Sequence, residues 1–249
     1  MLELVIGFAG GILMGATGMG LGVVITPLLI LSGYRPAVAV ATALGLAAVS
    51  KIAGVLVHRQ LGHWPGRRAW IVVGGGIGGV LGTWFLIRGW RLMTLPGADL
   101  WLKRGVAVAI LLAACALLVT GAERKKREES EHDENGTALL LAGLSVGPVE
   151  ALTSVGSGSL LGPLLVSTTG WSVPQLATVG NLFGWVVAVM SAMLYSRVGC
   201  FNVPLFGKVM IGLMPGLMAG VFLSRRIERR WYARFLGVVG VCLALRLLL

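Results

Sequence analysis

The stretch GATGMGLGVVITP, residues 15–27, lies inside one of the most apolar parts of the chain. It contains four glycines and a proline at a place where an uninterrupted membrane helix is expected. Each glycine in a helix interior costs about 1 kcal/mol relative to alanine. The stretch therefore predicts a break in a helix, and the fold depends on how the chain uses that break.

The composition is that of a membrane protein. Of 249 residues, 56% are hydrophobic and only 12% are charged, and the mean hydropathy is +0.88. Soluble domains are typically about 25% charged. Runs such as 103–120 and 204–223 approach the ~20 residues that cross ~30 Å of hydrocarbon. We therefore expect an all-α polytopic protein of the plasma or inner membrane, with the lipid bilayer as its surroundings.

The formal charge of +11 does not indicate nucleic-acid binding, because the basic residues fall mostly in short connectors between apolar runs. The three cysteines (Cys115, Cys200 and Cys242) are isolated in or beside apolar segments. Their spacing predicts neither a disulfide framework nor a metal site. We expect no cofactor.

The apolar segments are arranged as two similar halves. TGMGLGVVITPLLIL (17–31) matches SVGSGSLLGPLLVS (154–167), with Pro27 aligned to Pro163. Preserved order and spacing downstream indicate a duplication. We expect a first transmembrane repeat at 1–120, a charged linker at 121–137 and a second transmembrane repeat at 138–249. The segments, seven to eight depending on how the breaks are counted, are 4–32 (broken), 37–57, 69–88, 103–120, 138–168 (broken), 174–196, 204–223 and 232–249.

These residues resemble a known family. A glycine-rich break followed by a proline and leucines occurs once in each half, and an H-R-x-x-G-H run (His58, Arg59, Gly62, His63) follows the second apolar segment. Both features are similar to the TauE/SafE family of sulfite and organosulfonate permeases. The resemblance implies a transporter rather than an enzyme, with a small sulfur oxyanion (sulfite or an organosulfonate) as its substrate and mostly outward movement.

The two breaks predict a shared anion site. Backbone that is not hydrogen-bonded inside a bilayer must be buried in protein or line a wet cavity, and paired breaks are found at the repeat interface of many transporters. Helix starts after each break offer free N–H groups to an anion. The alternative is that the glycines only permit close helix packing. The expected binding residues are Thr17, Gly18, Gly20, Gly22, Thr153, Ser154, Gly156, Ser157, Gly158, Ser159 and Asn181.

Two ionisable residues lie within apolar segments. Charges at membrane depth cost at least ~2.5–3.5 kcal/mol unless they are paired or face water. In a functional interpretation Glu150 carries a coupling proton and Lys51 attracts the anion. In a structural one, they form an ion pair that holds the halves together. Arg59 and Arg197, at segment ends, are candidates for recruiting anions or simply snorkelling anchors.

The membrane topology has two alternatives. If each broken segment crosses the membrane once, the repeats are parallel and the basic residues are shared evenly between the two faces. If each broken segment is re-entrant, the repeats are inverted and one face carries most of the basic residues. The positive-inside rule favours the second arrangement.

The sequence therefore predicts a secondary transporter that works by alternating access, one repeat rocking against the other, with protons as a candidate coupling ion. There is no nucleotide-binding G-x-x-x-x-G-K-[ST] motif. A passive anion channel, and a membrane enzyme or assembly factor of sulfur metabolism, remain as alternatives. A homodimer is compatible with the sequence.

Overall fold

The computed structural model describes residues 1–17, 21–60, 66–89, 97–123, 136–224 and 229–248, and the regular secondary structure in these ranges is helical. The described helices are α1 (Leu2–Thr17), α2 (Gly22–Leu31), α3 (Pro36–Gln60), α4 (Arg67–Gly89), α5 (Ala98–Glu123), α6 (Gly136–Thr153), α7 (Leu161–Thr168), α8 (Val173–Arg197), α9 (Val203–Ser224) and α10 (Arg229–Leu248). The predicted all-helical class is confirmed, and both predicted breaks separate helices, α1 from α2 and α6 from α7.

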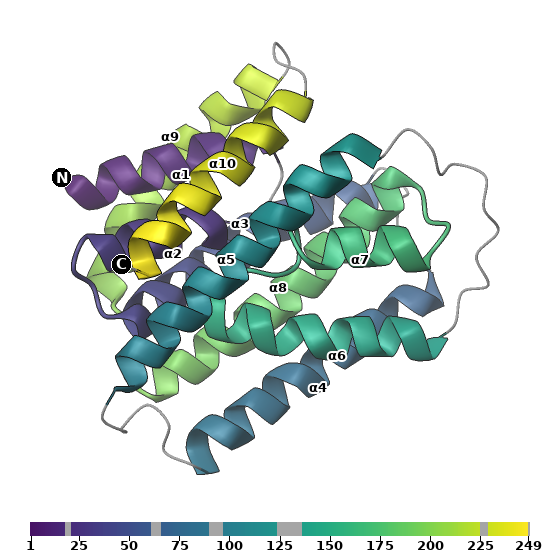
Figure 1. The fold of residues 1–249 in the computed structure, drawn as a ribbon, viewed down its shortest axis with the longest axis horizontal. Helices are drawn as coiled ribbons and strands as arrows, with labels where there is room; N and C mark the ends of the chain where they lie inside the picture. The colour runs from purple at the N-terminus through teal and green to yellow at the C-terminus, as the bar shows by residue number, and fades with distance from the viewer. Residues whose placement is uncertain (18–20, 61–65, 90–96, 124–135, 225–228, 249) are drawn as a thin grey trace.

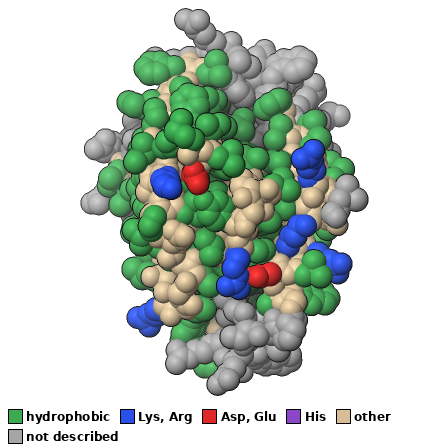
Figure 2. All heavy atoms as spheres, turned by 90° about the vertical axis from the view of Figure 1, so that its left-hand side faces the viewer, with side chains coloured by type: hydrophobic (Ala, Val, Ile, Leu, Met, Phe, Trp, Pro, Cys, Tyr) green, Lys and Arg blue, Asp and Glu red, His purple; other side chains and the backbone are tan. Residues whose placement is uncertain are grey.

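Several of these helices suit a membrane. Among the described residues, four helices are long and apolar enough to cross one, and they are Pro36–Leu56, Gly136–Thr153, Pro174–Arg197 and Val203–Leu223. Shorter apolar helices include Leu2–Ala16 and Gly22–Leu31. Figure 2 shows hydrophobic side chains over much of the described surface on one face, with few charges among them.

Two helix pairs pack backbone against backbone. In the α1–α9 pair, a methyl group on Gly7 would collide with Val209 and Leu213. In the α4–α6 pair, a methyl group on Gly143 would collide in the same way with Val72 and Gly76. Small residues let membrane helices approach this closely and gain dispersion contacts. In each pair, residues later in one helix contact residues later in the other. The two helices of each pair therefore run parallel.

Helices α3 and α8 cross the centre of the molecule in opposite directions. Gly54, late in α3, faces Asn181, early in α8, whereas Gly45 faces Phe201, just beyond the end of α8. The start of α3 and the end of α8 therefore lie at one end of the molecule. Arg35 there is paired with Asp99 across 3.1 Å, and we refer to this end as the Arg35 end.

Helices α1 and α2 form a hairpin. The Tyr34 hydroxyl, just after α2, donates a 2.8 Å hydrogen bond to Glu3 near the start of α1. The chain thus returns at the end of α2 to the level where α1 began, which is the Arg35 end. Figure 1 marks both chain termini on the same side of the molecule.

The helices gather into two lobes, which are visible at upper left and lower right in Figure 1. Helices α1, α2, α3 and α9 share one buried apolar cluster, which includes Ile25, Leu46 and Leu213. Helices α4, α6, α7 and α8 share another, which includes Val146 and Phe183. We call these the first and second lobes. A third cluster joins α5 and α10 to α3 and α8. Each lobe takes three helices from one half of the sequence and one helix from the other half.

Candidate functional site

The second helix break lies where the two lobes meet. Ser154, the first residue after α6, has φ of 62°, which is uncommon for a residue other than glycine. Its carbonyl approaches Gly22 at the start of α2 so closely that a methyl group there would collide with it. The Ser154 hydroxyl shares a buried hydrogen bond with Thr26 of α2. The second break therefore contacts the beginning of α2, the helix that follows the first break.

The Glu150 carboxylate is held by the loop that follows it. The Ser157 backbone N–H donates to Oε2 across 2.7 Å, and the Ser157 hydroxyl donates to Oε1 across 3.0 Å. Glu150 lies in the last turn of α6 and is only 2% exposed. These bonds close the loop back over the end of its own helix, and two donors thus converge on one carboxylate.

Lys51 reaches the same carboxylate from the first lobe. Its ammonium lies 3.5 Å from Glu150 Oε1 and is also hydrogen-bonded to the Ser157 hydroxyl. Both charged side chains are almost fully buried. Removing one partner of such a pair leaves an uncompensated charge and costs about 3–5 kcal/mol. The ion pair that the sequence left as one of two interpretations is therefore present, and it joins α3 to the second break.

Glycines make room for this cluster. A methyl group on Gly156 would collide with the Glu150 side chain, and one on Gly184 of α8 would collide with the Lys51 ammonium and with Ser157. Half-buried Asn181 lies one turn before Gly184 and packs on Gly54. Gly156 and Gly184 thus leave space for charged side chains. We refer to Lys51, Glu150 and Ser157 as the inter-lobe cluster.

The remaining expected residues are placed less centrally. The Thr153 hydroxyl donates to the Val149 carbonyl within α6. Gly158 is half-buried and Ser159 is buried in the turn before α7. Gly18, Gly20, and the side chains of Thr17 and Arg59, lie outside the described residues. The structure therefore leaves the first break partly untested.

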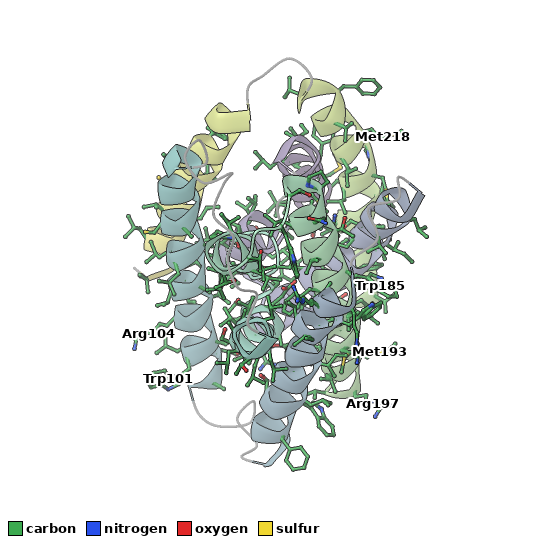
Figure 3. The ribbon with its side chains drawn as sticks, turned by 90° about the vertical axis from the view of Figure 1, so that its right-hand side faces the viewer. Trp101, Arg104, Trp185, Met193, Arg197 and Met218 are labelled. Carbon is green, nitrogen blue, oxygen red and sulfur yellow. The ribbon has the colours of Figure 1, made fainter. Side chains whose placement is uncertain are left out.

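Arg197 does not join the inter-lobe cluster. It is exposed at the end of α8, about 20 Å along the helix axis from Gly184 at 1.5 Å per residue. In Figure 3 it points outward, toward the same end of the molecule as Trp101 and Arg104 near the start of α5. This placement suits a residue that anchors a helix end or attracts anions to the surface.

Sequence reasoning missed two hydroxyl groups. Among the described residues, Ser191 Oγ and Tyr195 OH are buried and have no hydrogen-bond partner. Both residues line a narrow, largely apolar cleft between α4, α6 and α8 of the second lobe, and their hydroxyl oxygens are buried beneath its surface. Its other lining residues are Val80, Thr83, Trp84, Ala151, Leu194 and Val198. The sequence did contain a signal for these hydroxyls. Gly184, Ser191 and Tyr195 are spaced so that they lie on one face of α8, and Gly184 on that face borders the inter-lobe cluster.

The chain matches a known protein family over nearly its whole length. The family described as "Sulfite exporter TauE/SafE" matches residues 3–247. The chain belongs to the TauE/SafE family. This TauE/SafE protein is thus a multi-pass membrane transporter of the cell membrane. It is 25% identical, over 91% of each chain, to the probable membrane transporter protein YjnA of Bacillus subtilis (strain 168). No solved structure matches it.

Proposed function

We propose that this protein is a secondary transporter that moves a small sulfur oxyanion such as sulfite outward across the cell membrane, binding it where the two helix breaks meet between the lobes. The observation that carries the proposal is the inter-lobe cluster, in which an ammonium, a hydroxyl and a backbone N–H converge at one buried point. These donors suit an anion. Ionisable residues inside a membrane also mark substrate or ion pathways.

We further propose that the two halves are inverted repeats with re-entrant broken helices. The supporting contacts are equivalent in pairs. Gly212 of α9 abuts Leu4 and Phe8 of α1, and Gly75 of α4 abuts Leu140 and Leu144 of α6 in the same way. The antiparallel crossing of α3 and α8 supports an inverted relation, and the α1–α2 hairpin supports re-entrance. Such an arrangement places both breaks near the membrane midplane.

The composition of the two lobes changes which units are expected to move during alternating access. Helix α1 belongs to the first half of the sequence but packs backbone to backbone on α9 of the second half, so the two halves cannot rock apart as rigid units. Alternating access then consists of the first lobe moving against the second, with the inter-lobe cluster at the boundary.

Liposome flux tests the function. Purified protein is expected to catalyse sulfite movement that sulfate, thiosulfate and organosulfonates inhibit to different degrees, which also ranks its substrates. Accumulation against a gradient distinguishes a secondary transporter from a passive channel, because a channel only equilibrates the anion. Protein-free liposomes provide the background rate. Flux no faster than this background for every anion tested would contradict the proposal.

A further inference from the structure

We propose that the Glu150 carboxylate occupies the substrate-anion site itself, as an internal stand-in for the substrate, and that its protonation opens the site. This inference rests on the proposed function. The geometry points to it because the Ser157 N–H, the Ser157 hydroxyl and the Lys51 ammonium all converge on that carboxylate, and Lys51 also donates to the Ser157 hydroxyl. Ser157 N–H contacts one of its oxygens, and the Ser157 hydroxyl and Lys51 contact the other.

The donor set is what an oxyanion requires. An oxyanion binds best to a backbone N–H, a hydroxyl and a cation placed to meet different oxygens. A carboxylate is itself such an oxyanion. Ser157 and Lys51 come from different lobes, so these donors form a site only when the lobes meet. A methyl group on Gly156 or on Gly184 would collide with atoms of the cluster.

Charge balance makes the two occupants mutually exclusive. Among the described residues, Lys51 is the one charged side chain within ion-pair distance of Glu150. From α8, the uncharged Gly184 faces Lys51 and Ser157, and the uncharged Gly180 faces the Ser157 carbonyl. A substrate anion beside an ionised Glu150 would place two negative groups against one cation in a medium that screens poorly.

The empty site with a protonated Glu150 is also unfavourable. A protonated Glu150 without a substrate leaves the Lys51 ammonium buried and uncompensated, which is costly. Proton and anion must therefore arrive together, and they must leave together. The proton binds a Glu150 oxygen, the carboxyl group releases Ser157 and Lys51, and the substrate takes these donors. On release, the proton departs and the carboxylate returns.

This coupling determines the direction of the driving force. A divalent oxyanion together with one proton carries a net negative charge. A membrane potential that is negative inside therefore favours its outward movement, which is the direction proposed above. The coupling predicts co-movement of one proton and one anion in the same direction.

The test measures anion binding to the full-length protein between about pH 5 and about pH 8. Sulfate and methanesulfonate are the probes, because neither titrates in this range. In the wild type, the apparent Kd is expected to rise with pH, by up to about tenfold per pH unit, since one proton is taken up per anion. Glu150→Gln is expected to bind anions with one affinity, near the wild-type value at low pH, throughout the range.

Two further variants keep the test decisive. Glu3→Gln changes a carboxylate remote from the cluster and is expected to keep the wild-type pH slope. Ser157→Ala removes one donor hydroxyl, so it is expected to weaken binding at every pH while keeping the slope. In liposomes, a sulfate gradient is expected to move protons through the wild type, whereas Glu150→Gln exchanges sulfate without moving protons.

The outcomes separate this inference from the proposed function. A wild type that binds and transports anions without a pH slope, or a folded Glu150→Gln that retains the slope or binds no anion, would overturn the stand-in role and leave transport intact. A wild type that neither binds nor transports any of the anions would contradict the proposed function, and the stand-in role with it.

Discussion

At the scale of single residues, the glycines around the inter-lobe cluster provide space for its charged side chains. Sequence reasoning assigned the glycines of both breaks to backbone approach toward an anion. In the structure, Gly156 and Gly184 leave room for the side chains of Glu150 and Lys51. Gly184 lies outside both breaks, so the pattern of the breaks gave no signal for it. The charged partners were visible in the sequence, because ionisable residues within apolar segments stand out; their pairing was left open between two interpretations.

We expect Gly184→Ala to abolish anion transport and to lower stability. Its methyl group collides with the Lys51 ammonium and Ser157, and overpacking of a filled site typically costs about 1–3 kcal/mol. Gly162→Ala in α7 is the matched control, because nothing lies within 4 Å of the added methyl group. That control is expected to keep transport. Thermal unfolding and liposome flux measure both effects, and normal flux in Gly184→Ala would contradict the assigned packing.

The unpaired hydroxyls on α8 make a second prediction at this scale. Burying a hydroxyl without a partner costs about 1–3 kcal/mol, so Tyr195→Phe and Ser191→Ala are expected to leave thermal stability unchanged or raise it. If these hydroxyls become exposed to the anion during the transport cycle, both variants nevertheless slow anion flux. Leu194→Met, a volume-conserving change in the same cleft, is the control. Unchanged flux in both hydroxyl variants would remove the cleft from the mechanism.

At the scale of helices, the segments themselves follow directly from the sequence. Both breaks and the boundaries of the apolar runs are predicted to within a few residues, because glycine, proline and hydropathy act locally. The partners of each helix are not predictable in this way. The pairing of α1 with α9, and of α4 with α6, depends on which glycine faces meet in the folded protein. The repeat in the sequence does not reveal that each lobe takes one helix from the other half.

The α4–α6 contact can be tested with neighbouring glycines. Gly75 abuts Leu140 and Leu144 of α6, whereas a methyl group on adjacent Gly74 would meet nothing within 4 Å. We therefore expect Gly75→Val to lower the melting temperature sharply and reduce the yield of folded protein, since the helices must separate to accept the side chain. Gly74→Val is expected to change stability little. Size-exclusion profiles and thermal unfolding in detergent compare the pair, and equal effects would contradict the close packing.

At the scale of the whole molecule, the inverted arrangement predicts which parts share a membrane face. We expect a tag in the 121–137 linker to be accessible from the cytoplasm and a tag at the C-terminus to be accessible from outside, because the more basic face is retained inside. Protease protection in oriented vesicles measures both positions. Two tags on the same side would support parallel repeats and contradict the inverted ones.

Movement of one lobe against the other predicts that a covalent bond across the boundary stops transport. The hydroxyls of Thr26 and Ser154 are hydrogen-bonded across the lobes, so Thr26→Cys combined with Ser154→Cys brings two thiols within reach of a disulfide. In a background with Cys115, Cys200 and Cys242 replaced, we expect oxidation to abolish flux and a reductant to restore it. Each single cysteine variant, oxidised in the same way, is the control. An oxidised double variant that transports at the rate of its reduced form would show that the lobes do not separate here.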